Sequence, residues 1–285
     1  LSQINPTNKF IIQIDEYYKV KNDILTNLGH KNWQECVELC QDLLKMEQND
    51  KFILISMARA NRGLKDYNNA IVYWNRLLKL DRLDENGVLE YCNCLYNARK
   101  FKEIIKIISA RSDNNYTNKH LEIYIRSLFN IKKFDDCIIY CDKLLFLDKK
   151  SMIAMKFLSK SLMSLGQNIR AAKILENSLK IGSSNVETYE NLIETYLRMD
   201  ERERVNQVWE RIEINSKENM SNFLIALEVS MKFSWSQRSE RLLNNKKMKI
   251  DGLNFNIEIS KIALRNGNIS ESWKYLKLSE RDQEY

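Results

Sequence analysis

Two pairs of cysteines stand four residues apart in this chain of 285 residues: Cys36 with Cys40, and Cys137 with Cys141. Residues at positions i and i+4 share one face of an α-helix, so each pair could hold a soft metal ion between two thiolates. In the segment 67–77 the same two helix positions hold an alanine and a tryptophan, which is typical of core packing. We therefore expect core thiols here and no metal site.

Other residues that could carry chemistry are few. The two histidines, His30 and His120, are far apart in the sequence, so a catalytic site based on histidine would need contributions from distant segments. The seven glycines are scattered and form no phosphate-binding loop. The sequence therefore predicts a chain with no catalytic residues and no cofactor.

The composition indicates an all-helical protein. The chain has 7 Gly and 1 Pro, with 29% charged and 44% hydrophobic residues, so turn formers are scarce and helix formers abundant. It contains no run of eighteen or more uncharged apolar residues, so we expect no membrane span. The six cysteines lie in apolar helical patterns without a secretory signal, which favours reduced thiols and a cytoplasmic location. The net charge of +7 is a mild basic bias that favours acidic partners over nucleic acid.

A fixed period organises these elements. The segment 51–84 reads as an apolar-periodic helix, a short turn and a second helix that opens at Tyr67. Equivalent openers recur every 33 or 34 residues, and ordinary loop lengths would not hold such a spacing. The eight openers are Trp33, Tyr67, Phe101, Phe134, Asn168, Arg202, Trp235 and Ile269.

The segment around Tyr67 resembles the tetratricopeptide repeat, in which each unit is a hairpin of a helix A and a helix B. A small residue, Ala58, stands in the expected helix A, and Ala70, Trp74 and Leu77 follow the aromatic opener in helix B. The proline that the family places after helix B is absent, so we expect polar residues to form the turns between units. The resemblance implies an all-α, right-handed superhelical solenoid of about eight antiparallel helix hairpins.

The period also predicts the domain organisation. Residues 1–16 extend or cap the first helix, and residues 17–285 hold the solenoid. A single hairpin cannot bury its own apolar face, so neighbouring units must stack to form a core. The predicted units are 17–50, 51–84, 85–117, 118–151, 152–185, 186–218, 219–252 and 253–285.

In tetratricopeptide proteins the A helices line a concave groove that binds ligands. Counting back from each helix-B opener places donors and aromatic residues on this face in repeats two to five. Arginine forks suit carboxylates, and asparagine can grip backbone amides, so the set suits an extended, acidic peptide. An ordinary solvated basic face remains the alternative. The predicted groove residues are Arg59, Arg62, Asn93, Tyr96, Arg126, Phe129, Lys156 and Lys160.

The groove is expected to change character beyond repeat five. Glu187, Glu190 and Glu194 share one face of the helix A of repeat six. Phe223 and Leu227 follow at groove positions of repeat seven. This acidic step and apolar patch could receive a different segment, such as a following domain of the same protein.

Three functions are compatible with the sequence. The first is a protein-interaction scaffold that binds a protein or peptide in the groove. The second is a non-catalytic recognition or assembly module of a larger enzyme, because proteins that resemble this one often carry a glycosyltransferase or sulfotransferase domain and this chain does not begin with Met. The third, RNA binding by a helical-repeat protein, is less favoured because the groove lacks a repeating polar pair for base edges.

Overall fold

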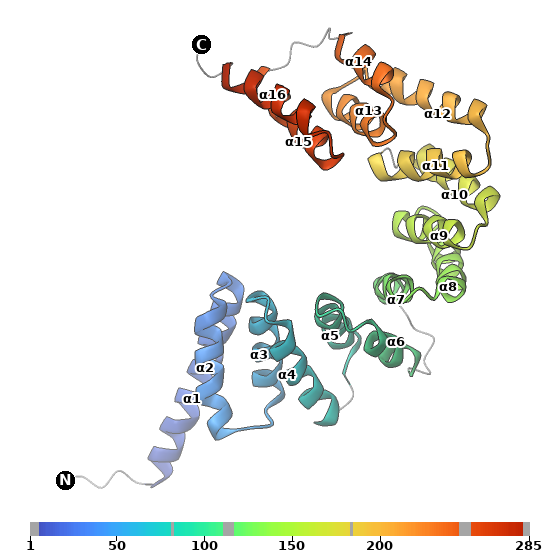
Figure 1. Ribbon diagram of the computed structural model, residues 1–285. Helices are drawn as coiled ribbons and strands as arrows, with labels where there is room; N and C mark the ends of the chain where they lie inside the picture. The colour runs from blue at the N-terminus through green and yellow to red at the C-terminus, as the bar shows by residue number, and fades with distance from the viewer. Residues whose placement is uncertain (1–5, 81–82, 111–116, 183–184, 245–251, 282–285) are drawn as a thin grey trace. The chain divides into compact units, whose positions relative to one another are not determined.

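The structure is a computed structural model, and it describes residues 6–80, 83–110, 117–182, 185–244 and 252–281. Within these ranges the chain forms sixteen α-helices in tandem and no strand (Figure 1). The chain divides into two compact units, residues 1–133 and 134–285. Each unit is described by itself below.

The first unit holds the helices α1 to α7 and the second holds α8 to α16. In the first unit the helices are α1 (Pro6–His30), α2 (Trp33–Met46), α3 (Lys51–Gly63), α4 (Tyr67–Leu80), α5 (Glu85–Asn97), α6 (Phe101–Ser109) and α7 (Asn118–Asn130). In the second they are α8 (Phe134–Leu147), α9 (Met152–Ser164), α10 (Asn168–Ile181), α11 (Val186–Arg198), α12 (Arg202–Asn215), α13 (Met220–Lys232), α14 (Ser236–Asn244), α15 (Gly252–Arg265) and α16 (Ile269–Arg281).

The predicted fold class is confirmed: the helices form tandem hairpins of the tetratricopeptide type. Odd-numbered helices are the A helices and even-numbered helices are the B helices. Seven of the eight predicted openers are the first residue of a B helix, and α14 begins at Ser236, one residue after Trp235. The helix α1 begins at Pro6, so the described part of the N-terminal extension is continuous with the first helix A.

The core follows the repeat. Three residues after each opener, the small or apolar side chains are buried from Cys36 through Val205, and seven residues after it Trp74 and Trp209 are buried as well. All six cysteines are buried, which confirms the core interpretation of both pairs. Two positions depart from the pattern near the end of the array, where Arg238 is half-buried and Leu276 is exposed.

Polar residues replace the missing proline at the start of the A helices. Asp50 accepts a hydrogen bond from the backbone N–H of Ile53 at 3.1 Å and thereby caps α3. The same carboxylate binds Tyr17 Oη at 2.6 Å and Lys21 Nζ at 2.8 Å, which ties α1 to α3. Burial would raise the pKa of Asp50, but the bonds from Lys21 and Tyr17 lower it below its usual value. Side-chain caps of the same kind start α5, α9, α11 and α13, and are made by Asp84, Ser151, Asn185 and Asn219.

Every A–B turn has the same backbone. In the first turn the N–H of Lys31 bonds the carbonyl of Leu28, and the N–H of Asn32 bonds the carbonyl of Asn27, which is a Schellman motif. The pattern recurs in all eight hairpins. It requires one residue with positive φ in each turn, and these residues are Lys31, Lys65, Arg99, Lys132, Gly166, Asp200, Ser234 and Gly267.

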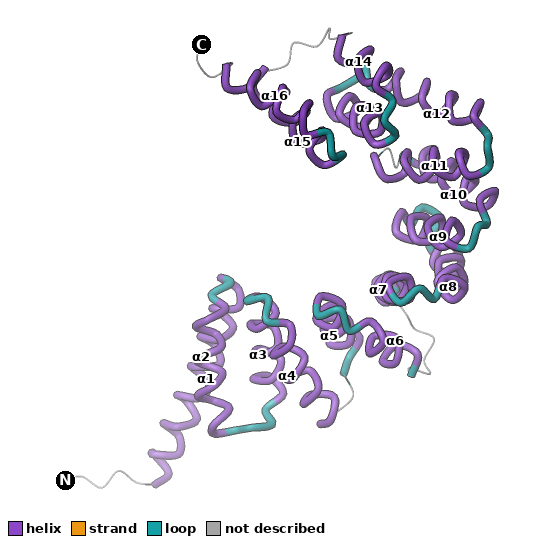
Figure 2. The backbone as a smooth tube through the Cα atoms, viewed as in Figure 1, coloured by secondary structure: helices purple, strands orange, loops and turns teal. Residues whose placement is uncertain are grey.

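The turns of neighbouring hairpins meet at one end of the helices. In Figure 2 the α1–α2 and α3–α4 turns lie at the same end, and the α2–α3 connection lies at the other. A Cβ added to Gly63 would lie 2.3 Å from Cδ2 of Trp33, so the indole ring packs against the end of α3. None of the described helices is long and apolar enough to cross a membrane.

We expect Asp200→Gly to stabilise the protein. Asp200 holds a φ of 54° that an L-residue adopts at a cost of about 1 kcal/mol and glycine does not. Its ion pair with Arg202 is exposed and contributes little. The melting temperature should rise by about 2 °C, measured by circular dichroism. The reciprocal control, Gly166→Ala, should lower it, because Gly166 has a φ of 72°. Equal melting temperatures for all three proteins would contradict this account.

Candidate functional site

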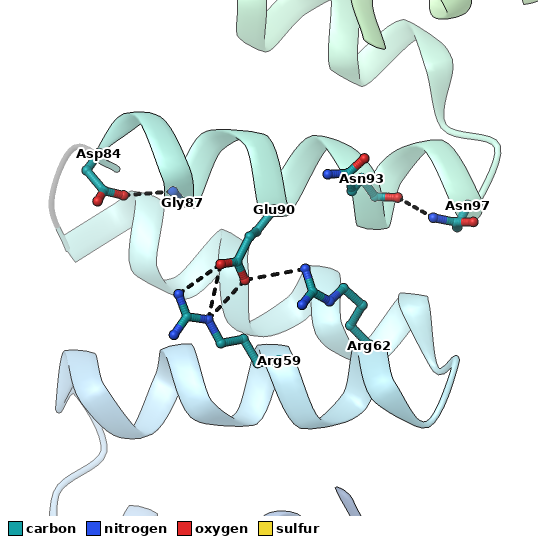
Figure 3. A network of polar contacts seen from close by, with 7 residues as sticks. All are labelled: Arg59, Arg62, Asp84, Gly87, Glu90, Asn93 and Asn97. Carbon is teal, nitrogen blue, oxygen red and sulfur yellow. Dashed lines mark hydrogen bonds and ion pairs between the residues drawn. The ribbon is translucent and has the colours of Figure 1, made fainter. Parts of the chain in front are cut away.

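Two arginines of α3 and one glutamate of α5 form the centre of the candidate site (Figure 3). The Nε of Arg59 donates to Oε2 of Glu90 at 3.0 Å, and its Nη2 donates to Oε1 at 2.8 Å. The Nη1 of Arg62 lies 3.5 Å from the same Oε2. All three side chains are between 20% and 44% exposed, so solvent reaches the cluster. We call these residues the arginine cluster; two guanidinium groups share one carboxylate, and the cluster keeps a net positive charge.

The helix geometry explains why these side chains meet. Arg59 and Arg62 are three residues apart, so they point to one face of α3. The α5 helix begins at Glu85, where the carboxylate of Asp84 accepts the N–H of Gly87 at 2.7 Å (Figure 3). This cap fixes the start of α5, and Glu90 follows on the side of the helix that faces α3. The ion pair of Arg59 and Glu90 thus joins α3 to α5, the A helices of successive hairpins.

A row of carboxamides continues from the arginine cluster toward the end of the A helices. Asn93 is exposed, and its carbonyl accepts a hydrogen bond from Nδ2 of Asn97 at 2.7 Å (Figure 3). Asn130 of α7 donates to the carbonyl of Arg126 at 2.7 Å and lies 3.5 Å from the hydroxyl of Tyr96. The Tyr96 ring meets the Phe101 ring edge to face, with centroids 5.4 Å apart. Tyr96 is therefore held in place and half-exposed.

The predicted residues of repeat four are less accessible. Arg126 is half-buried, and its Nε atom is buried without a hydrogen-bond partner among the described residues. Phe129 is half-buried on the same helix, three residues away. The structure thus brings Arg59, Arg62 and Asn93 together as an exposed polar face, and it places Arg126 and Phe129 at its half-buried margin.

A hollow opens beside the arginine cluster. It has a volume of about 260 Å³ and lies between α3, α4 and α5. Arg59 and Lys51 contribute cationic side chains, and Asp84 and Gly87 contribute the start of α5. The buried ring of Trp74 also lines it, so the hollow combines a polar rim with an apolar wall. This space can hold a side chain of a bound segment.

The second unit repeats the arrangement with lysines. The Nζ of Lys156 lies 2.6 Å from Oε2 of Glu187, and Lys160 contacts the other carboxylate oxygen. Burial would raise the pKa of Glu187, but the bonds from Lys156 and Lys160 lower it below its usual value. The two lysines stand on α9 and the glutamate on α11, so a cation-to-acid contact again joins successive A helices. A hollow of about 140 Å³ lies beside them.

Acidic side chains gather on the next part of this face. Burial raises the pKa of Glu190, Lys232 opposes the rise, and Glu228, Glu187 and Glu194 add to it. Glu194 lies 2.5 Å from Arg198 on its own helix. Glu228 of α13 lies 3.6 Å from Arg265. The predicted acidic step is therefore extended by Glu228, which the sequence analysis did not single out.

The predicted apolar patch of repeat seven is not on the surface. Leu227 is fully buried and Phe223 is 7% exposed, so both side chains belong to the core. The helix-B opener was placed at Trp235, whereas α14 begins at Ser236. Counting eight residues back from Ser236 gives Glu228 instead of Leu227. One residue corresponds to about 100° on a helix, so this shift exchanges a core position for a surface position.

No group of three or more His, Cys, Asp or Glu side chains in the described ranges could hold a metal ion. The Sγ atoms of Cys137 and Cys141 are 4.0 Å apart in the core. Hydrogen bonding to Cys137 and burial both raise the pKa of Cys141. That thiol stays protonated, and a protonated thiol is a poor metal ligand.

Comparison with known proteins supports the repeat fold. The family model described as anaphase-promoting complex, cyclosome, subunit 3, matches residues 64–144. No curated protein sequence matches the chain significantly.

Solved structures match over much greater lengths. A tetratricopeptide repeat protein from Parabacteroides merdae has a TM-score of 0.62 at 10% identity, and the match covers 93% of this chain and 99% of that one. YrrB, a TPR protein with an unusual peptide-binding site, has a TM-score of 0.53 at 12% identity over 72% of this chain and 99% of its own. PilF from Pseudomonas aeruginosa has a TM-score of 0.53 at 13% identity, covering 80% and 96%. At these identities the matches show the fold alone.

The hairpins, the repeated turn and these matches together show a helical repeat fold of the tetratricopeptide type.

The sequence predicted the basic residues of the A-helix face and Glu187, but neither Glu90 nor the pairing of these acids with the basic residues. Arg59 and Glu90 are 31 residues apart, and so are Lys156 and Glu187. This separation is one repeat less one helical turn, which brings the two positions onto facing sides of successive A helices. A search for opposite charges at that separation would have found both pairs.

We expect Glu190→Gln to raise the stability of the protein at pH 7. Because the pKa of Glu190 is higher in the folded than in the unfolded chain, its ionised form costs stability above the unfolded pKa. The melting temperature should rise by about 1–2 °C at pH 7, measured by calorimetry. The gain should vanish as the pH falls below about 4.5, where the carboxyl is protonated in both states.

The matched control for this measurement is Glu194→Gln, because that carboxylate is paired with Arg198. It should give no gain at pH 7. A similar rise for both variants would mean that net charge, and not the surroundings of Glu190, sets the effect.

Proposed function

We propose that the protein is a non-catalytic interaction scaffold, and that the A-helix face of α3 and α5 binds an extended, acidic segment of a partner protein. The observation that supports this proposal most strongly is the arginine cluster. Its two guanidinium groups are exposed, held in position by Glu90 and only partly neutralised. Two arginines can therefore take a second carboxylate while keeping the first.

The neighbouring side chains suit an extended chain. The carboxamide of Asn93 is exposed one turn beyond Glu90 and can donate to a backbone carbonyl and accept a backbone N–H. The half-exposed Tyr96 adds an aromatic contact in the same direction. An arginine fork for one acidic side chain and an asparagine for the backbone give a segment both position and direction.

The hollow beside Arg59 supports a second element of recognition. Its apolar wall is the Trp74 ring, and its rim is polar. A bound segment with an apolar side chain near its acidic residue can fill this space. Burying one such side chain contributes about 1.5–3 kcal/mol, more than an exposed ion pair does.

In the second unit the Lys156, Lys160 and Glu187 group offers the same surplus of one positive charge. We propose it as a separate anchor for an acidic group, because its two lysines share one carboxylate as the arginines do. The six cysteines are buried thiols, which supports a reducing compartment such as the cytoplasm for this scaffold.

Selection from a random peptide library displayed on phage tests the proposed function. Peptides that bind the protein should be enriched in Asp or Glu next to an apolar residue. For a selected peptide, the double variant Arg59→Ala with Arg62→Ala should weaken binding about tenfold, measured by isothermal titration calorimetry. Glu90→Gln should strengthen it, because the intramolecular competitor for the arginines is removed.

The matched control replaces two exposed lysines of the B helices, Lys79→Ala and Lys102→Ala, which removes the same charge from another face. Its affinity should stay within about twofold of the parent protein. Selected peptides without acidic enrichment, or an unchanged affinity in the arginine variant, would refute the assignment of this face.

A further inference from the structure

The residues with positive φ in the A–B turns differ between the two units. In the first unit all four are basic: Lys31, Lys65, Arg99 and Lys132, with φ between 58° and 63°. In the second unit the four equivalent residues are two glycines, an aspartate and a serine. We call the four basic residues the turn edge. The turn backbone is the same in both units, so the backbone does not require basic residues there.

A basic side chain is a costly choice at this position. An L-residue with positive φ costs about 1 kcal/mol relative to glycine, and asparagine is the usual alternative. Gly166 and Gly267 show that glycine fits the same turn of this protein. Four successive turns therefore carry long cationic side chains at a position where the fold favours glycine.

The four side chains stand on one end of the first unit. All four are exposed. The packing of Trp33 against Gly63 holds the first two turns side by side. The contact between Asn130 and Tyr96, at the ends of α7 and α5, does the same for the last two. Neighbouring helices pack about 10 Å apart, so the turn edge presents a positive charge about every 10 Å.

The charges of the turn edge are uncompensated, unlike those of the A-helix face. In the part of the chain that the structure describes, no ion pair involves any of the four residues. Arg59 and Arg62, by contrast, share Glu90. The positive ends of the α2 and α6 dipoles lie at this edge as well, and neither helix has a side-chain cap. These uncapped helix starts add to the positive charge of the edge.

We infer that the turn edge is a second interaction surface, separate from the A-helix face, which binds an extended acidic segment of a partner protein. An extended chain rises about 3.3 Å per residue, so an acidic side chain at every third residue repeats about every 10 Å. That spacing places one carboxylate opposite each of Lys31, Lys65, Arg99 and Lys132. The proposed partner segment is therefore an extended chain with an acidic side chain at about every third residue.

Two observations favour a protein segment over nucleic acid. Asp66 and Glu35 stand among the cations of the edge and would repel a continuous row of phosphates, whereas discrete carboxylates can avoid them. Two of the aromatic residues at this edge, Trp33 and Phe101, are also engaged in the fold. The Trp33 ring packs on Gly63 and the Phe101 ring on Tyr96, so neither ring offers a face for base stacking.

The test uses the full chain and a fluorescein-labelled peptide of about 12 residues with Glu at every third position in a Gly/Ser background. Binding is followed by fluorescence anisotropy at low salt. The variant that combines Lys31→Gly, Lys65→Gly, Arg99→Gly and Lys132→Gly should bind about tenfold more weakly. Glycine relieves the backbone at all four positions, so this variant should fold at least as well as the parent, as circular dichroism will show.

Three comparisons decide the outcome. A control variant with four exposed B-helix lysines replaced by alanine, at Lys45, Lys79, Lys102 and Lys106, should bind within about twofold of the parent; equal weakening would overturn the proposal. A peptide with its four Glu residues adjacent should bind more weakly than the spaced one, and equal binding would overturn it. An oligouridine RNA that binds the parent more tightly than the spaced peptide, and loses binding in the glycine variant, would assign the edge to nucleic acid instead.

The double variant Arg59→Ala with Arg62→Ala separates the two surfaces. It should leave the binding of the spaced peptide unchanged, because the arginine cluster lies on the A-helix face. A loss of binding as large as that of the glycine variant would place the peptide on the A-helix face and overturn the turn edge.

Discussion

Each helix hairpin of this chain has an apolar face that only a neighbouring hairpin can cover, and the rest of the structure depends on that constraint. Burying Trp74 or Cys36 requires the next helix A to arrive at a fixed distance and angle. The Schellman turn supplies one half of that geometry, because it reverses the chain in the same way in every hairpin. The side-chain caps at the start of α3, α5, α9, α11 and α13 supply the other half. A spacing of 33 or 34 residues is the consequence in the sequence.

The same stacking explains the charges of the A-helix face. Successive A helices lie next to each other, so a cation on one faces the next one across a short, half-exposed gap. Glu90 occupies that gap in the first unit and Glu187 in the second. Each acid balances part of the positive charge that would otherwise accumulate along a row of donors. A ligand interacts with the net positive charge that remains. The affinity of this face for an anion therefore depends on the glutamates as much as on the arginines and lysines.

Features that local interactions set could be predicted from the sequence, whereas contacts between different hairpins could not. The openers of seven B helices were predictable because a local turn with a fixed number of residues sets them. The eighth, α14, begins one residue later than expected, and that residue decides that Leu227 is in the core and Glu228 on the surface. The pairing of Arg59 with Glu90 depends on the lateral fit of two helices from different hairpins, which a count within one repeat does not contain.

At the positive-φ position of each A–B turn, the fold requires a backbone conformation but no particular side chain. The hydrogen bonds of the turn are made by the backbone, and the side chain at that position points to solvent without a packing role. Glycine, aspartate and serine all occur there in the second unit. Stability therefore gives no reason for Lys31, Lys65, Arg99 and Lys132 and some reason against them. A feature that recurs with the repeat, opposes the backbone preference and is confined to one unit is better explained by a partner of that unit than by its folding.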